Sequence, residues 1–184
     1  MGRRWNDAEI ENALKSIVIL VDTREKKWEH IRAALEKLGC PYIAQKLDFG
    51  DYSYRYTRPD GTEETCECLI AVERKANIDE ICGNFTYGRP RFEREFQRAK
   101  GKGAEVHLLV EDANWGKIKN HMYMSQLNPA ALEGNLLSWV FRYDLRLWYN
   151  TTALAGDFIY RLFRYHLRNK LQQEMEEGEE DAEA

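Results

Sequence analysis

The sequence has no long uninterrupted run of apolar residues, and this absence argues against a helix that crosses a membrane. Its first residues, Met-Gly-Arg-Arg-Trp-Asn-Asp, lead into no apolar segment of the kind that a secretory signal requires. Both absences predict a cytoplasmic protein without a membrane partner. With 184 residues, 43% of them apolar, the chain is long enough to build one domain around a sizeable core.

Cysteine is also scarce, with four residues at positions 40, 66, 68 and 82. No two of them have the C-x-x-C spacing that is typical of a structural zinc site, so we expect no bound zinc. Cys66 and Cys68 are two positions apart in an expected strand, which predicts that both thiols face the core.

Lysine and arginine are absent from the last eleven residues, 174–184, which hold seven acidic groups. The other 173 residues carry 27 basic and 24 acidic side chains, a net charge of +3. The low pI of about 5.7 therefore does not exclude a nucleic acid partner. We expect residues 1–173 to form a single domain and residues 174–184 to form a disordered acidic tail. In an alternative role, the tail would mimic nucleic acid and compete for a basic groove.

Apolar periodicity predicts helices that alternate with short strands. The expected helices are 7–14, 28–38, one that begins near Ile78, one that carries Phe92 and Phe96 after a loop with Gly83 and Gly88, one that opens at Asn128-Pro129, and 156–173. The expected strands are 16–22, 42–56, 65–75, 104–111 and 145–150. Because 58–61 has the residues of a tight turn, the second and third strands should form a hairpin. This order favours an α/β fold with a central mixed β-sheet flanked by α-helices.

Acidic side chains lie near the ends of three of these strands. Asp22 and Glu25 follow the first strand, Asp51 lies in the second, and Glu73 lies close to the end of the third. Carboxylate oxygens suit Mg²⁺ or Mn²⁺, and four neighbouring carboxylates would repel one another without a cation. The pattern predicts a metal site at these four residues, where Lys75 would orient the attacking water or stabilise charge on a phosphate. In the alternative interpretation, the same charges form surface salt bridges.

Three motifs together carry a resemblance to a known family. The sequence contains Val21-Asp22-x-Arg24-Glu25, then Gly50-Asp51, then Glu73-Arg74-Lys75-x-x-x-Asp79. This arrangement resembles the nuclease domain of the XPF family of structure-specific DNA endonucleases, within the PD-(D/E)XK superfamily. The resemblance implies a restriction-endonuclease-like fold, dependence on magnesium or manganese, and incision of DNA at flaps, forks or other branches, as in repair or recombination.

The same resemblance implies roles for single residues. Catalytic roles fall to Asp22, Asp51, Glu73, Arg74 and Lys75. Metal ligands would be Asp22, Glu25, Asp51 and Glu73, and Arg24 and Asp79 would support the site or the substrate backbone.

Longer members of the family also carry a tandem helix-hairpin-helix module or a helicase region, which we do not find in this sequence. In this respect the chain resembles the compact stand-alone versions encoded by bacteria and their phages, which implies a bacterial or phage-infected cell and a place near the nucleoid. Family members often dimerise through the nuclease domain, so a homodimer is expected as well.

An arginine-rich segment at 83–98 is the best candidate for holding DNA. The candidate phosphate contacts are Arg89, Arg91, Arg94 and Arg98. In the alternative interpretation this is a solvated helix face, on which Glu93 and Glu95 pair with the arginines.

Two other functions are compatible with the sequence. One is a non-catalytic DNA-binding scaffold subunit, against which the intact Glu73-Arg74-Lys75 motif argues. The other is a restriction-like endonuclease, which would use the same chemistry but read a base sequence.

Overall fold

The computed structural model describes residues 5–183, with side chains as far as residue 176. Its helices are α1 (Asp7–Lys15), α2 (Glu29–Lys37), α3 (Ile78–Thr86), α4 (Arg89–Gly101), α5 (Trp115–Lys119), α6 (Pro129–Tyr143) and α7 (Thr152–Glu183). Its strands are β1 (Val18–Asp22), β2 (Tyr42–Gln45), β3 (Tyr52–Thr57), β4 (Glu63–Thr65), β5 (Ile70–Lys75), β6 (Glu105–Glu111) and β7 (Leu145–Asn150). Helix starts follow local capping chemistry: Asn6, Asn77 and Asn128 each accept a backbone N–H of the first turn.

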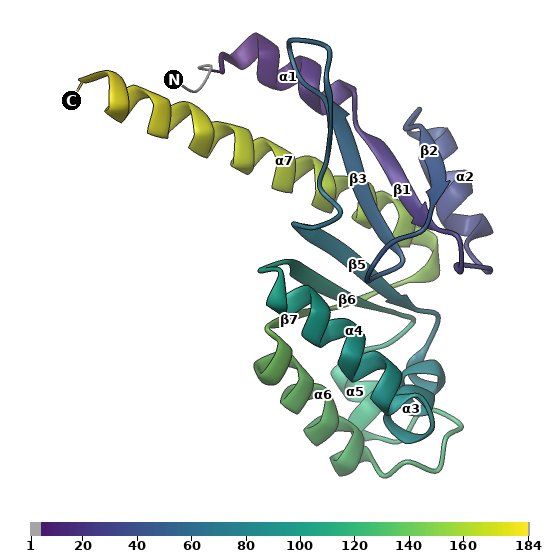
Figure 1. Ribbon diagram of the computed structural model, residues 1–184. Coiled ribbons are helices and arrows are strands. Elements are labelled where there is room, and N and C mark those ends of the chain that lie inside the picture. The colour runs from purple at the N-terminus through teal and green to yellow at the C-terminus, as the bar shows by residue number, and fades with distance from the viewer. Residues whose placement is uncertain (1–4, 184) are drawn as a thin grey trace.

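The strands form one mixed sheet in the order β2-β1-β3-β5-β6-β7, and β4 pairs with β3 (Figure 1). β1 is parallel to β2 and antiparallel to β3, whereas β5, β6 and β7 are mutually parallel. This arrangement confirms the predicted α/β fold with helices around a central mixed sheet.

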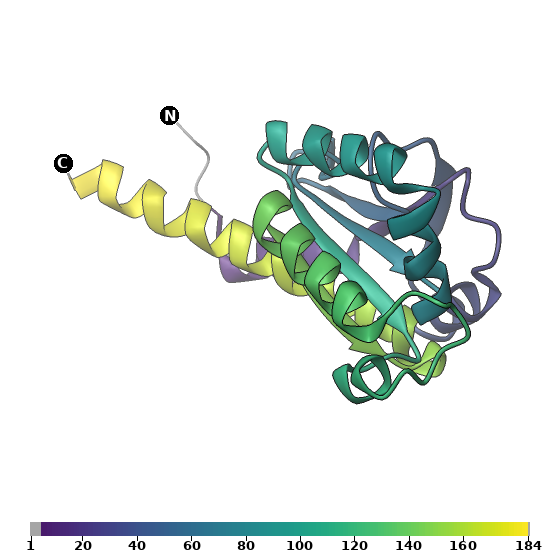
Figure 2. The same ribbon diagram turned by 90° about the horizontal axis from the view of Figure 1, so that it is seen from below.

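Two apolar cores lie on opposite faces of the sheet. One core packs α1, α2 and α7 against β1, β3 and one face of β5, with Tyr52, Tyr54 and Tyr56 fully buried in it. The other core packs α3, α4 and α6 against the opposite face of β5 and β6. Figure 2 shows the helices of the two groups on the two sides of the sheet. The strands between them carry the site.

Two expected strands are each divided in the structure. The segment 42–56 contains β2 and β3, separated by a loop in which Gly50 has a φ of +72°. The segment 65–75 contains the end of β4 and all of β5, because a turn interrupts it. The turn is closed by a hydrogen bond of 2.9 Å from Leu69 N to Cys66 O. Strand alternation therefore stops at this turn. The prediction for the two thiols is right for Cys66, which is buried, and wrong for Cys68, which is exposed.

Three helices differ from expectation. Helix α3 runs through Gly83, where a loop was expected, and the short helix α5 was not predicted. Helix α7 continues to Glu183 instead of ending near residue 173. Glu174 accepts hydrogen bonds from the Trp5 indole at 2.9 Å and from Lys170 at 2.6 Å. These contacts join Glu174, the first residue of the expected tail, to the body of the protein. Disorder of residues 175–184 stays a prediction, and Ala184 lies outside the described residues.

Within residues 5–183, no helix is both long enough and apolar enough to cross a membrane.

Candidate active site

A tight turn places Asp51 between the ends of β1 and β5. Asp51 N donates to Val72 O at 2.8 Å, and Asp51 O accepts from Asp22 N, also at 2.8 Å. Gly50 permits this arrangement, because a Cβ there would lie 2.7 Å from the Cβ of Ala71 and the backbone has a positive φ. The motif glycine is thus required by close strand packing.

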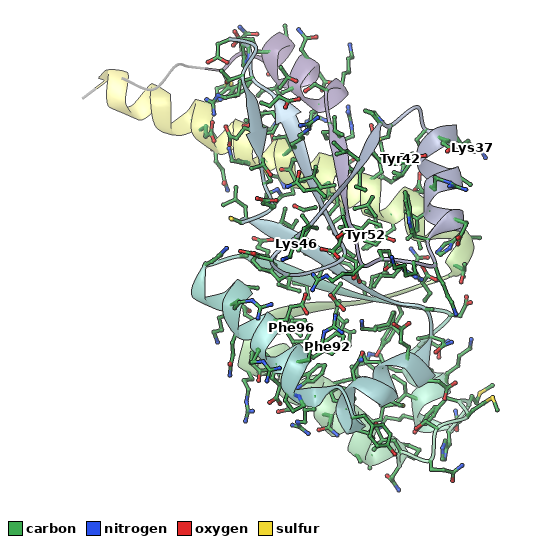
Figure 3. All side chains as sticks on the ribbon, turned by 45° about the vertical axis from the view of Figure 1, so that its right-hand side comes forward. Lys37, Tyr42, Lys46, Tyr52, Phe92 and Phe96 are labelled. Atoms are coloured by element: carbon green, nitrogen blue, oxygen red, sulfur yellow. The ribbon has the colours of Figure 1, made fainter. Side chains whose placement is uncertain are left out.

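Alternation along β5 separates Glu73, Arg74 and Lys75, the three adjacent charged residues of the third motif. Glu73 and Lys75 both lie on the α4 side, and both are buried; Lys75 Nζ is 2.5 Å from Glu73 Oε1. The same ammonium lies 4.3 Å from the centroid of the Phe92 ring, a cation–π contact. Phe92 and Phe96 project from α4 toward the sheet (Figure 3).

Asp51, Glu73 and Lys75 line one cavity of about 610 Å³. Its other walls come from Arg74 in β5, from the segment after β1, from the start of α3 and from α4. They include Arg24, Glu25, Arg74, Glu80, Arg91 and Glu95. The structure therefore brings together carboxylates and cations that are up to 71 positions apart in the chain.

The carboxylates of this cavity influence one another. Burial, followed by repulsion from Glu73, holds the pKa of Asp51 well above its ordinary value. Burial opposes the charged form of Lys75, but Glu73 and Asp51 outweigh it, so the pKa of the ammonium is raised. A bound cation would oppose both the burial and the repulsion from Glu73, and so would favour the ionised form of Asp51.

Asp22 is not among the residues that line the cavity. Its Oδ1 accepts from Arg24 N at 2.8 Å and from Arg24 Nε at 2.7 Å, and its Oδ2 accepts from Leu47 N at 2.7 Å and from Arg24 Nη2 at 3.1 Å. Burial alone would raise the pKa of Asp22, but these partners outweigh it and the pKa is lowered. The geometry gives Asp22 a part in fixing Arg24 and the 46–49 loop.

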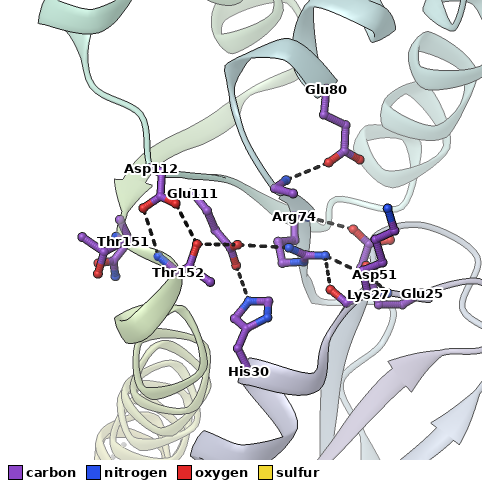
Figure 4. A network of polar contacts seen from close by, with 12 residues as sticks. Glu25, Lys27, His30, Asp51, Arg74, Glu80, Glu111, Asp112, Thr151 and Thr152 are labelled. Carbon is purple, nitrogen blue, oxygen red and sulfur yellow. Dashed lines mark hydrogen bonds and ion pairs between the residues drawn. The ribbon is translucent and has the colours of Figure 1, made fainter. Parts of the chain in front are cut away.

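Arg74 points to the face opposite Glu73 and Lys75. Its guanidinium contacts Glu25 Oε1 at 3.2 Å, Glu111 Oε2 at 3.1 Å and the carbonyl of Lys27 at 2.6 Å (Figure 4). Glu111 in turn contacts His30 Nε2 at 2.8 Å. This network joins the ends of β1, β5 and β6 and holds Glu25 at the cavity wall.

The four-carboxylate metal site is not assembled in the described part of the chain. No group of three or more acidic, histidine or cysteine side chains there could hold a metal ion. Asp51 and Glu73 remain as neighbouring carboxylates on the cavity. They fit a magnesium ion nevertheless, because Mg²⁺ commonly takes one or two carboxylates and completes its shell with water and substrate phosphate.

Asp79 supports a loop next to the site. Its Oδ1 accepts from Met124 N at 2.8 Å and from Ser125 N at 2.6 Å, and it does not line the cavity. Asp79 thereby ties the 120–128 connection to the start of α3.

The four candidate DNA-binding arginines have different environments. Arg91 lines the cavity. Arg89 pairs with Glu93 at 2.9 Å, and Arg98 donates to Asp48 O at 3.0 Å. Arg94 is exposed on α4.

Glu95 is the site residue that sequence reasoning missed. In the alternative interpretation of the 83–98 segment, Glu95 was a solvated partner of the arginines. Glu93 does pair with Arg89, but the side chain of Glu95 is buried on the cavity. Burial, followed by repulsion from Glu73, raises the pKa of Glu95. The signal was present in the sequence, because Arg91 and Phe92 precede Glu95 by four and three positions and so share its helix face.

The sheet, its flanking helices and the carboxylate-lysine cavity define the restriction-endonuclease-like class of folds. Residues 21–162 match the sequence profile of the ERCC4 domain, and the chain belongs to that family. The structure is similar to that of XPF from Aeropyrum pernix, with a TM-score of 0.61 and 22% identity over 82% of this chain and 65% of that one. A structure of XPF from Aeropyrum pernix in complex with DNA matches with a TM-score of 0.54 and 22% identity, over 79% and 64% of the two chains.

The chain thus spans slightly less than two thirds of the archaeal protein that it resembles. A search of curated proteins found no match.

Proposed function

We propose that this protein is a divalent-metal-dependent endonuclease that hydrolyses phosphodiester bonds in DNA. The observation that carries the proposal is the gathering of Asp51, Glu73 and Lys75 on one cavity, with Lys75 Nζ 2.5 Å from Glu73 Oε1. Carboxylates for a cation and a buried ammonium beside them are the groups that phosphodiester hydrolysis requires. Membership of the ERCC4 domain family supports this reading.

Asp51 and Glu73 would hold Mg²⁺ or Mn²⁺, which supplies a Lewis acid and an activated water when bound. Lys75 stabilises the negative charge that develops on the phosphate. Its contacts with Glu73 and Phe92 fix the ammonium before the substrate arrives. Arg91, at the cavity wall, neutralises a phosphate of the bound strand.

We assign Asp22, Arg24, Arg74 and Asp79 to the framework of the site. Asp22 and Arg74 are engaged by partners away from the reacting groups, so they act by holding Arg24 and Glu25. Glu25 remains at the wall and is available as a ligand through water.

Branched DNA is the substrate that we propose, with flaps and forks as its simplest forms. The motif resemblance supports the branched form, and the structure of the archaeal XPF in complex with DNA supports DNA as the kind of substrate. A homodimer through this domain and a bacterial or phage-infected cell remain predictions.

The test is a cleavage panel of flap, fork, four-way junction, plain duplex and single-stranded DNA with Mg²⁺, Mn²⁺ or chelator. We expect cleavage of branched DNA only with a metal. Lys75→Ala and Asp51→Asn should each lower kcat by about 10²–10³-fold, while DNA binding measured with Ca²⁺ is kept. Lys119→Ala is the matched control, because this lysine is exposed and pairs with Glu133 at 3.4 Å, outside the cavity.

The other outcomes select the other functions. Binding of branched DNA without cleavage under any metal would identify a scaffold subunit and overturn the proposal. Cleavage of plain duplex at one fixed sequence would identify a restriction-like enzyme.

A further inference from the structure

Glu95 occupies an unusual position for a carboxylate on a charged helix. Helix α4 carries arginines on its exposed side, yet Glu95 is only 6% exposed and lines the same cavity as Asp51 and Glu73. A buried carboxylate must find donors or lose stability. The identity of those donors indicates what the residue does.

The first donor is the backbone of the motif turn. Gly50 N donates to Glu95 Oε1 at 3.2 Å, across the gap between α4 and the segment that precedes β3. Gly50 comes directly before Asp51, and its positive φ and its approach to Ala71 leave the turn little freedom. The hydrogen bond from α4 therefore acts on the backbone that aims the Asp51 carboxylate.

The second partner is Arg24, which forms an ion pair with Glu95 and not a hydrogen bond. Its Nη2 lies 3.9 Å from Glu95 Oε1, while its Nε is held by Asp22 at 2.7 Å. One carboxylate oxygen thus faces both the turn before β3 and the arginine after β1. Glu95 links α4 to two strand ends.

Helix α4 also carries the groups on the other side of the cavity. Phe92 contacts the Lys75 ammonium, and Arg91 lines the wall. A fixed contact between α4 and the Gly50-Asp51 turn sets how far Asp51 lies from these groups. Displacements of about 1 Å in such a site lower rates by about 10²-fold.

We propose that Glu95 is a positioning residue for the hydrolysis, which holds the Gly50-Asp51 turn against α4 through its hydrogen bond with Gly50 N. The inference rests on the proposed function for its kinetic consequence. It assigns the side chain a role as hydrogen-bond acceptor, not as a ligand or a proton carrier.

The proposed role of Glu95 predicts different effects for substitution by Gln and by Met. Gln keeps an acceptor oxygen at the same reach but has no charge, whereas Met keeps the length and has no comparable acceptor. If the acceptor is what matters, Glu95→Gln should retain the turn and Glu95→Met should lose it. Glu95→Ala is a second removal variant with a smaller side chain, and Glu93→Ala is a control on the same helix.

The kinetic test compares these variants on the substrate that the wild-type protein cleaves best. Glu95→Met and Glu95→Ala should lower kcat by about 10–100-fold with KM within about 2-fold. The defect would lie in the orientation of the Asp51 carboxylate and not in substrate binding. Glu95→Gln should stay within about 3-fold of wild type, as should Glu93→Ala. Equal defects in Glu95→Gln and Glu95→Met would overturn the inference, since they would show that the charge is required.

A second readout does not depend on activity. Hydrogen exchange of the Gly50 amide, followed by NMR in the full-length protein, should be slow in wild type and Glu95→Gln and faster in both removal variants. Unchanged exchange in folded Glu95→Met or Glu95→Ala would overturn the contact. Wild-type protein that cleaves no substrate would instead refute the proposed function and leave the exchange experiment to decide the contact.

Discussion

Replacing Arg74 by methionine tests whether this motif residue holds the site together. The guanidinium is 5% exposed and lies between Glu25 and Glu111, at 3.2 and 3.1 Å. Burial opposes its charge, but Glu25 and Glu111, with Tyr52, outweigh it and raise the pKa of Arg74. Arg74→Met removes the charge and leaves the Glu111 carboxylate, itself 2% exposed, without its main cation.

Loss of one partner from a buried ion pair costs about 3–5 kcal/mol of unfolding free energy. For a domain of this size that corresponds to a fall in Tm of roughly 6–20 °C. Urea denaturation of wild type and Arg74→Met measures it directly. Adding Glu111→Gln to Arg74→Met should recover part of the loss, because no buried charge is then left at position 111. A loss below about 1 kcal/mol for Arg74→Met would refute the reasoning.

Two further substitutions test the turn and a buried imidazole. Gly50→Ala should destabilise the fold by at least about 2 kcal/mol, because its Cβ would meet Ala71 Cβ at 2.7 Å and the positive φ is strained; wild-type urea stability would contradict this. Burial lowers the pKa of His107 from 6.5 to about 4. The unfolded chain therefore takes up a proton first, and stability falls by up to about 3 kcal/mol as the pH drops from 6.5 to 4. His107→Asn keeps an acceptor for the Trp148 indole, whose Nε1 donates to His107 Nδ1 at 2.9 Å. It should flatten that part of the urea stability profile, and equal slopes in both proteins would count against the explanation.

The sequence predicted the fold well wherever a local signal and a buried face coincided. Asn77 and Asn128 cap the helices that were expected to begin after them. The strand 145–150 has the expected bounds, and 104–111 differs by one residue; β6 is buried from Val106 to Glu111, whereas β7 buries only Leu145. The divided strands at 42–56 and 65–75 were missed because sequence alternation continues through a turn that backbone hydrogen bonds create.

The sequence predicted a set of site residues, and the structure shows which of them lie together. Sequence reasoning found Asp51, Glu73 and Lys75, which the structure places on one cavity. It also predicted Asp22 as a metal ligand. In the structure, the carboxylate oxygens of Asp22 accept hydrogen bonds from the Arg24 side chain and from the Leu47 amide. Such partners come from a loop whose path no periodicity specifies. Which oxygens stay open to a cation is therefore decided by tertiary contacts.

Glu73, Arg74 and Lys75 are adjacent in the sequence, but the geometry of β5 places them on two different faces of the sheet. Side chains of successive strand residues point to opposite faces, so three adjacent charges cannot all serve one cavity in the same way. Glu73 and Lys75 face α4 and meet at 2.5 Å, whereas Arg74 reaches Glu111 on the opposite face. Arg74, between Glu73 and Lys75 in the sequence, is thus well placed to fix the end of β5 from the opposite face of the sheet. Under the proposed function, a single strand carries the reacting groups on one face and their support on the other.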